Sequence, residues 1–342
     1  MLLAVGALQG AWQRSRRAAL RQCNPEWMGG QLTGHCVAQL KHGGSAQGLA
    51  AVGGQLVSGG ANEHLRVWGP RTGQLVSSVA GRGYRIAPLP GGRFATAPFT
   101  GKTAQVWDAA SATRICELQG HTGYVNCVAA VPAEGLVATG SEDATVRLWC
   151  TATGAHRATL EGHTMGVRAL ALLADGRLAS GGVDDAVRLW DVRRTHACTA
   201  VLKHANTVYA LCAVEWGWLA SGCGDRKVHL WNGGSGAREW LLQGHVGSVN
   251  AMAALPRSLL ASGSEDMTVR VWSVGARACV AVLEGHASQC AGPGSAPAGR
   301  WCLAAGRPPG GGGLGVWIPF ASAMAMAARP SSPEMPLFSV IA

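Results

Sequence analysis

The sequence predicts an all-β protein in which one strand-rich unit is repeated in tandem. Histidines preceded by Gly or Lys recur every 41 or 42 residues, and tryptophans follow at the same spacing. The chain contains 49 glycines and 13 tryptophans against 3 tyrosines and 4 phenylalanines, a composition typical of many short strands and turns. Such a fixed period indicates a repeat architecture, in which neighbouring units bury each other's apolar faces. The histidines are His121, His163, His204, His245 and His286, and the tryptophans are Trp107, Trp149, Trp190, Trp231 and Trp272.

Each unit is expected to form four strands in a fixed order. Strands of about five residues with a turn signal every ten or so residues are typical of all-β arrays. A first strand that is almost wholly apolar is expected to be buried on both faces. In the unit that begins at His163 the expected order is an apolar strand at 167–173, a turn at 174–176, a strand ending at 179–181, a turn carrying Asp184, a strand at 187–190 and an outer strand at 198–202.

Composition limits the class of protein. Hydrophobic residues make up 48% of the chain and charged residues 14%, which excludes a disordered chain. The net charge of +10 permits a nucleic-acid or acidic partner without identifying one. The odd number of cysteines, 11, with no C-x-x-C, predicts reduced thiols in an intracellular protein, cytoplasmic or nuclear. No Cys or His pair has the spacing of zinc ligands, so no metal or cofactor is expected, and no apolar run is long enough to span a membrane.

The units resemble the WD40 repeat, most specifically in ATGSEDATVRLW, ASGGVDDAVRLW, ASGCGDRKVHLW and ASGSEDMTVRVW, which end at Trp149, Trp190, Trp231 and Trp272. The resemblance covers roughly residues 34–320 and implies a β-propeller of four-stranded antiparallel blades. Seven blades are expected, the last of them degenerate, ending at Trp317 and closed by an N-terminal strand at 35–40. Six blades plus a loose tail is the alternative. Residues 1–33 are expected to be a mostly disordered extension, or a targeting segment, and 321–342 a C-terminal tail.

The resemblance also implies a structural hydrogen-bond network of His, Ser or Thr, Asp and Trp in each blade. Four tandem copies of Ser, His and Asp indicate a structural unit and not a hydrolase, so no catalytic residue is expected. The sets are His121, Thr139, Asp143 and Trp149; His163, Ser180, Asp184 and Trp190; His204, Ser221, Asp225 and Trp231; and His245, Ser262, Asp266 and Trp272.

Two weaker units precede these four. The unit ending at Trp68 has His42 and Ser58 in phase, and Asn62 stands where Asp is expected. The unit ending at Trp107 has Gly101 at the Asp position, so its network is expected to be absent. The arginines before each Trp (Arg66, Arg147, Arg188 and Arg270) are expected on the solvated side of their strands, with their stems covering apolar surface.

The function that the resemblance implies is a non-catalytic scaffold or adaptor that binds peptides or proteins on its loop-rich face. A substrate-recognition subunit of a ubiquitin ligase and an RNA-associated subunit are the alternatives, although direct contact with nucleic acid is not favoured. A place in a larger complex is possible. The contact positions fall beside the start of each first strand and just before each turn Asp. They are Gln47, Arg85, Tyr124, Asn126, Glu142, Arg168, Tyr209, Asn250 and Glu265.

Overall fold

The computed structural model describes residues 34–40, 46–60, 64–69, 73–81, 83–98, 100–283 and 314–319. Every described residue belongs to the unit Thr33–Ala342. The described residues form strands and two short 3₁₀ turns, η2 (Pro132–Glu134) and η3 (Glu215–Gly217), with no α-helix among them. None of their helical segments is long and apolar enough to cross a membrane. The predicted extension at 1–33 and tail at 321–342 lie outside the described residues.

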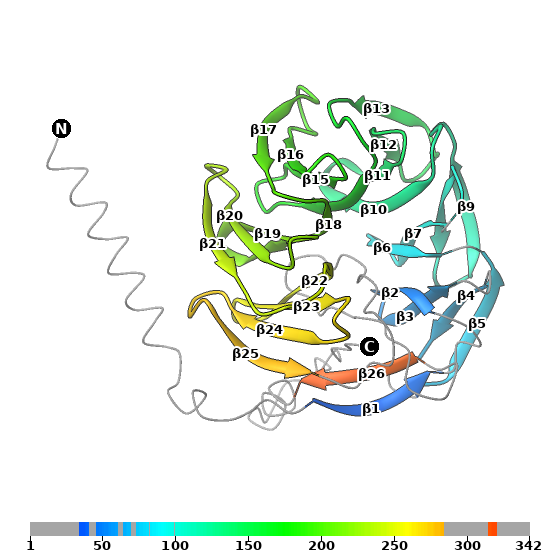
Figure 1. Ribbon diagram of the computed structural model, residues 1–342. Helices are drawn as coiled ribbons and strands as arrows, with labels where there is room; N and C mark the ends of the chain where they lie inside the picture. The colour runs from blue at the N-terminus through cyan, green and yellow to red at the C-terminus, as the bar shows by residue number, and fades with distance from the viewer. Residues whose placement is uncertain are drawn as a thin grey trace, which may run out of the picture. The chain divides into compact units, whose positions relative to one another are not determined.

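Six antiparallel sheets of four strands each follow one another along the chain, and each sheet pairs its strands in sequence order (Figure 1). Every turn within a sheet therefore joins adjacent strands. The first three sheets are β2 (Ala46–Val52), β3 (Gln55–Gly60), β4 (His64–Trp68) and β5 (Leu75–Ala80); β6 (Arg85–Leu89), β7 (Arg93–Ala97), β8 (Ala104–Asp108) and β9 (Thr113–Leu118); and β10 (Val125–Val131), β11 (Leu136–Ser141), β12 (Val146–Cys150) and β13 (His156–Leu160). The other three are β14 (Val167–Leu172), β15 (Leu178–Gly182), β16 (Ala186–Trp190) and β17 (Cys198–Lys203); β18 (Val208–Val214), β19 (Trp218–Cys223), β20 (Val228–Asn232) and β21 (Arg238–Leu242); and β22 (Val249–Leu255), β23 (Leu259–Ser264), β24 (Val269–Ser273) and β25 (Ala278–Leu283).

A seventh sheet has two described strands, β1 (Gly34–Leu40) and β26 (Leu314–Pro319). They pair antiparallel, with Gly34 opposite Pro319 and Leu40 opposite Leu314. The residues predicted to form the closing strand therefore pair with the segment around Trp317. The stretch between, 284–313, lies outside the described residues together with His286, so the count of seven blades stays a prediction.

The sheets pack through their first strands. Strand β10 contacts β6 on one side and β14 on the other, and the same succession continues through β18 to β22. Apolar clusters consequently bridge neighbouring sheets. One cluster joins Leu148 and Leu160 of the third sheet to Val167, Leu178 and Trp190 of the fourth. The core therefore lies mainly between blades, as expected for units that cannot bury their faces alone.

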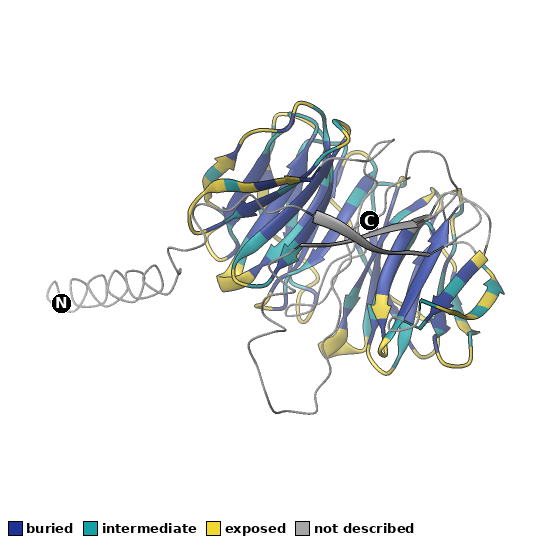
Figure 2. Cartoon of the chain, turned by 90° about the horizontal axis from the view of Figure 1, so that it is seen from below, coloured by how far each residue is buried: buried dark blue, intermediate teal, exposed yellow. Residues whose placement is uncertain are grey.

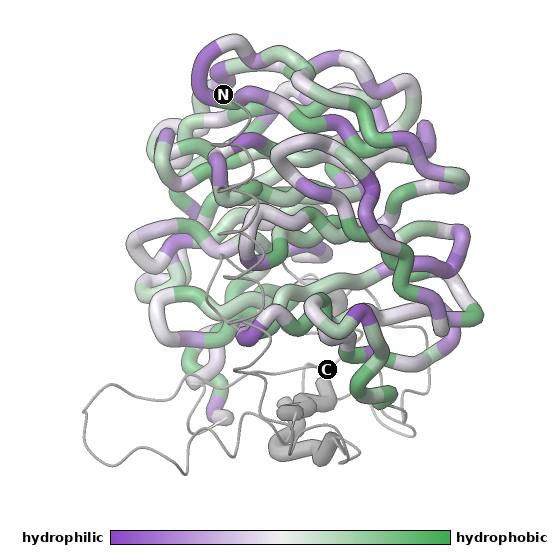
Figure 3. Tube along the Cα trace, turned by 90° about the vertical axis from the view of Figure 1, so that its left-hand side faces the viewer, coloured by the Kyte–Doolittle hydropathy of each residue, from purple (hydrophilic) through white to green (hydrophobic). Residues whose placement is uncertain are grey.

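The first three strands of each four-stranded sheet are mostly buried, and the last strand is the most exposed. Strand β10 has five buried residues in seven, whereas β5 alternates between exposed and half-buried residues. Figure 2 shows the buried inner strands in dark blue and the exposed outer strands and turns in yellow. Figure 3 shows many of the hydrophilic residues at the turns. The apolar first strands are thus mostly buried, as expected, and the second strands are at least as well covered, with all five residues of β15 buried.

Candidate partner-binding face

A four-residue network lies inside the sheet β14–β17. His163 Nδ1 is 2.8 Å from Asp184 Oδ1, and His163 Nε2 is 2.6 Å from the Ser180 hydroxyl. The Trp190 Nε1 donates to that hydroxyl at 2.7 Å. Because the carboxylate can only accept, the imidazole carries its proton on Nδ1, and Nε2 accepts from Ser180. The donors therefore run from Trp190 through Ser180 and His163 to Asp184.

This arrangement resembles a catalytic triad in composition only. The Ser180 hydroxyl has 0% exposure, and its oxygen already accepts the indole N–H. A nucleophilic serine must meet the carbonyl carbon of a substrate, which a fully covered hydroxyl cannot do. The network instead satisfies polar groups that would be costly to bury unpaired.

The sheets β10–β13 and β22–β25 contain the same contacts. Additional donors reach the two Asp carboxylates from Thr145 and Thr268, through both backbone N–H and hydroxyl. The shared distances are 2.8 Å for His121–Asp143, 2.7 Å for His121–Thr139, 2.7 Å for Trp149–Thr139, 2.8 Å for His245–Asp266, 2.7 Å for His245–Ser262 and 2.7 Å for Trp272–Ser262.

The sheet β18–β21 departs from the predicted network. The Ser221 hydroxyl still bonds His204 Nε2 at 2.7 Å and accepts from Trp231 at 2.9 Å. However, His204 Nδ1 lies 3.2 Å from the Leu202 carbonyl oxygen, and Asp225 instead pairs with His229 at 2.9 Å. The assignment of Asp225 to His204 was therefore wrong. His229 stands where the sister blades have arginine, and its ring offers the carboxylate a nearer donor.

The two N-terminal sheets retain only the indole contact among their described residues. Trp68 donates to Ser58 at 2.7 Å, and Trp107 donates to Thr96 at 3.1 Å. Gly101, at the Asp position, uses its carbonyl to accept the backbone N–H of Val125. His42 and Asn62 lie outside the described residues.

The half-buried arginines differ from the solvated side chains expected. The Nε atoms of Arg66, Arg147, Arg188 and Arg270 are buried without a hydrogen-bond partner within the described chain. Arg188 reaches Asp184 at 3.8 Å. A Cβ at Gly120 or Gly244 would lie 2.8 or 2.6 Å from the Nη1 of the blade's own arginine. The glycine of each Gly-His pair thus leaves room for the guanidinium.

Burial and hydrogen bonding shift the pKa values of the network groups. Burial lowers the pKa of His121, His163 and His245, and the paired carboxylates oppose this only in part. Burial also lowers the pKa of His204, to about 4, with His229 adding to the shift. Burial alone would raise the pKa of Asp266, but hydrogen bonds from Thr268, His245 and Val246 lower it to about 2.

These shifts predict that acid destabilises the fold. The unfolded chain binds protons on these histidines below about pH 6.5, whereas the folded chain resists protonation until a lower pH. Their contribution to stability is therefore present above about pH 6.5 and is lost as the pH falls, and Asp266 adds a second loss below about pH 4. We expect the melting temperature to fall between about pH 7.5 and about pH 4.5. His245→Gln should melt lower at neutral pH but show a shallower pH dependence, and a flat profile for the wild type would contradict the assignment.

β-Bulges place the predicted contact residues on one face. The ladder between the first two strands shifts register around Gln47, Asn126, Arg168, Tyr209 and Asn250. A bulge residue leaves the ladder and has its side chain re-aimed, which is why bulges occur beside functional sites. Arg85 instead begins β6, whose ladder with β7 is regular. All of these positions are at the starts of first strands, on the face that also carries the turns with Asp.

Three predicted side chains meet across two blades, next to an exposed tyrosine. Asn126 donates from Nδ2 to the Val167 carbonyl at 3.0 Å, and Arg168 Nη1 lies 3.4 Å from Asn126 Oδ1. Arg168 Nη2 lies 3.6 Å from Glu142, and both side chains are about 40% exposed. The backbone N–H of Glu142 donates to the Tyr124 carbonyl. Tyr124 is 43% exposed. We call Tyr124, Asn126, Glu142 and Arg168 the bulge cluster.

The other predicted positions lie apart from this cluster. Asn250 donates to Glu265 at 3.2 Å, which repeats the pairing of a bulge residue with the residue before the turn Asp. The guanidinium of Arg85 lies 5.1 Å from the ring centre of Tyr84. Tyr209 is half-buried, and its side chain comes near Gly224. Gln47 lies on β2, at the edge of the residues that the structure describes.

Comparison with known proteins agrees with this geometry. The family model described as "WD domain, G-beta repeat" matches residues 112–150, 154–191, 196–232 and 236–273. These ranges coincide with the four sheets from β10 to β25, offset by one strand. Residues 112–273 therefore carry four WD40 repeats.

Three curated relatives share these repeats. The pre-mRNA-splicing factor PRP46 of Eremothecium gossypii is 47% identical over 58 residues, 17% of this chain and 14% of the relative. The nuclear distribution protein PAC1 of Arthroderma otae is 29% identical over 152 residues, 37% of this chain and 33% of the relative. The mitochondrial division protein 1 of Schizosaccharomyces pombe is 42% identical over 81 residues, 22% of this chain and 12% of the relative. The chain thus spans a third or less of each relative's length.

Proposed function

We propose that the protein is a non-catalytic scaffold that binds a peptide or protein partner on the face carrying the bulge cluster. The observation that carries the proposal is the convergence of an exposed tyrosine, an amide and an Arg–Glu pair from two blades. Tyrosine and arginine are typical anchors of protein interfaces. The Arg168–Glu142 pair is exposed enough to exchange its internal contact for one with a partner.

The hydrogen-bond networks of the blades favour a binding role for the bulge cluster over a catalytic one. The Ser, His and Asp side chains of the networks are buried and hydrogen-bonded to one another, so they hold the turns in place. Binding residues commonly lie on loops that a rigid scaffold positions. WD40 repeats are in general used for protein–protein interactions, and the role of each named relative belongs to a whole protein of which this chain matches a third or less.

The proposal extends to the architecture and location of the protein. The pairing of β1 with β26 supports a seventh blade closed by residues 35–40, within a propeller spanning 34–320. A place in a larger complex inside the cell, in the cytoplasm or the nucleus, is supported by relatives named as splicing and nuclear distribution proteins.

Affinity purification with mass spectrometry tests the binding face. The double variant Tyr124→Ala, Arg168→Glu removes the anchor ring and reverses the charge beside Glu142. We expect specific partners of the wild type to fall about tenfold or more in recovery, because truncating interface anchors commonly costs more than about 1.4 kcal/mol. Melting curves must first show that the variant remains folded.

The chain offers a matched control for the charge reversal. Arg193 lies 3.5 Å from Glu134 across the same two blades, with side chains exposed 49% and 38%. This pair involves η2 and the turn after β16, at the opposite ends of the strands. Arg193→Glu should leave partner recovery unchanged. Loss of partners in the control alone would place the binding surface on the opposite face and refute the proposal.

A further inference from the structure

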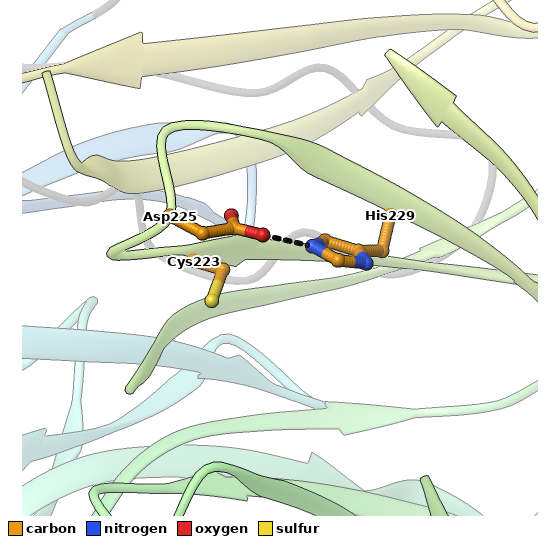
Figure 4. A group of neighbouring side chains, drawn as sticks. All are labelled: Cys223, Asp225 and His229. Atoms are coloured by element: carbon orange, nitrogen blue, oxygen red, sulfur yellow. Dashed lines mark hydrogen bonds and ion pairs between the residues drawn. The ribbon is translucent and has the colours of Figure 1, made fainter. Parts of the chain in front are cut away.

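A group of three possible metal ligands lies in the hairpin between β19 and β20. Cys223 ends β19, Asp225 lies in the turn and His229 is the second residue of β20. One ligand atom from each residue lies within 4.8 Å of the others. Figure 4 shows the three side chains on one hairpin, with the carboxylate of Asp225 directed at the ring of His229.

This combination occurs in one of the four matched blades. The sister positions of Cys223 hold Ser141, Gly182 and Ser264, and those of His229 hold Arg147, Arg188 and Arg270. The cysteine and the second histidine therefore occur together in one blade. In that blade the turn residue Asp225 contacts His229 and not the network histidine, His204. In the sister blades that carboxylate is bonded by the network histidine and by backbone N–H groups. Asp225 instead accepts from His229 and from the backbone N–H of Lys227, and the Cys223 thiol donates to the Asn206 carbonyl at 2.9 Å.

Two of the three candidate ligands are buried, and the third is partly exposed. Cys223 is 0% exposed and His229 is 2% exposed, while the Asp225 side chain retains 15% exposure at the turn. His229 has one hydrogen-bond partner, Asp225, and its Nδ1 is buried without any partner among the described residues. The ring nitrogen that faces Asp225 is Nε2, so Nε2 is the atom that would bind a metal, in place of its hydrogen bond to the carboxylate. Both nitrogens of the neighbouring His204 are occupied, by Ser221 and by the Leu202 carbonyl.

We propose that Cys223, Asp225 and His229 bind a zinc ion. Sulfur, imidazole nitrogen and carboxylate oxygen are the three donors that Zn²⁺ takes from proteins, whereas Mg²⁺ and Ca²⁺ prefer oxygen alone. Three protein ligands leave a fourth position for water on the side where Asp225 is exposed. On binding, the S–H bond of Cys223 breaks, a Zn–S bond forms and the proton passes to solvent. The C-x-D-x₃-H run that holds these residues contains no pair of Cys or His at zinc-ligand spacing, so the spacing of such pairs does not predict it.

Zinc titration of the full-length chain tests the proposal. The protein, freed of metal with a chelator, is titrated near neutral pH against a chromophoric competitor, and cobalt(II) is used in parallel. We expect one site whose cobalt form shows thiolate-to-metal charge-transfer absorption. Cys223→Ser, which copies Ser141 and Ser264 of the sister blades, and His229→Gln should each weaken that site about tenfold or more, because losing even an outer-shell partner costs about that much.

The controls separate the site from the other thiols and from the fold. Cys198, exposed on β17, is replaced by Ser and should leave the affinity unchanged. Melting curves of the metal-free variants show whether each is folded. The proposal is overturned if the folded wild type binds no zinc, or if both Cys223→Ser and His229→Gln fold and bind it as tightly as the wild type.

Discussion

Replacing Trp190 with alanine is expected to lower the free energy of unfolding by about 3–5 kcal/mol. Trp190 is 1% exposed and belongs to the apolar cluster that joins its own sheet to Leu148 and Leu160 of the preceding one. The substitution leaves a cavity between two blades and removes the indole donor from the buried Ser180 hydroxyl. Urea unfolding monitored by circular dichroism measures the loss.

Trp216 is the matched control for this substitution. It is 74% exposed, in the 3₁₀ turn between β18 and β19. Trp216→Ala should change the free energy of unfolding by no more than about 0.5 kcal/mol, because it removes no buried contact. A Trp190→Ala variant as stable as the Trp216→Ala variant would show that the indole does not join the blades.

A second large loss of stability is expected when Gly181 of β15 is replaced by valine. A Cβ at Gly181 would lie 2.6 Å from Val208 Cγ1, which begins the first strand of the next sheet. Gly140 approaches Val167 and Gly222 approaches Val249 in the same way, each at 2.7 Å. The side chain would push adjacent blades apart, and such overpacking costs about 1–3 kcal/mol. The melting temperature of Gly181→Val should therefore fall.

Gly275 provides the comparison for steric strain. A Cβ at Gly275 would have no heavy atom within 4 Å, and its φ lies outside the left-handed region. Gly275→Ala should be neutral or slightly stabilising, because alanine reduces the entropy of the unfolded chain. Equal melting temperatures for Gly181→Val and Gly275→Ala would mean that the blades do not meet at Gly181.

The repeat could be predicted from the sequence because its signals are local and recur. The His, Ser or Thr, Asp and Trp of a blade fall within about thirty residues, and four phased copies distinguish a structural network from a catalytic site. The apolar first strands carried their own signal of burial on both faces. The strand at 35–40 was predicted from its likeness to an outer strand, and it does pair with the segment at Trp317.

Two contacts differ from those predicted by position in the repeat, and the cause in each case is a neighbouring residue that the spacing does not reveal. Asp225 was assigned to His204 by phase, but His229 lies within 2.9 Å and takes the carboxylate instead. The arginines two residues before the blade tryptophans were expected on the solvated side of their strands. Arg147, Arg188 and Arg270 are instead half-buried, because the glycine of the Gly-His pair in the same blade leaves space for the guanidinium group. For Asp225 and for the arginines, the predicted position in the repeat was right. The contact that each side chain makes depends on the direction in which it points.

By itself, the sequence determined the period of the blades, the order of their strands and the residues that tie each blade together. These depend on hydrogen bonds and alternation within one unit, which three of the four matched blades repeat in full. The tertiary structure alone decided which residues of different blades meet, such as Arg168 with Glu142 and Gly181 with Val208. It also decided which residues meet within one hairpin, as Cys223 and His229 do. Such contacts depend on bulges and on distances between packed strands, and neither has a signature in the spacing of residues along the chain.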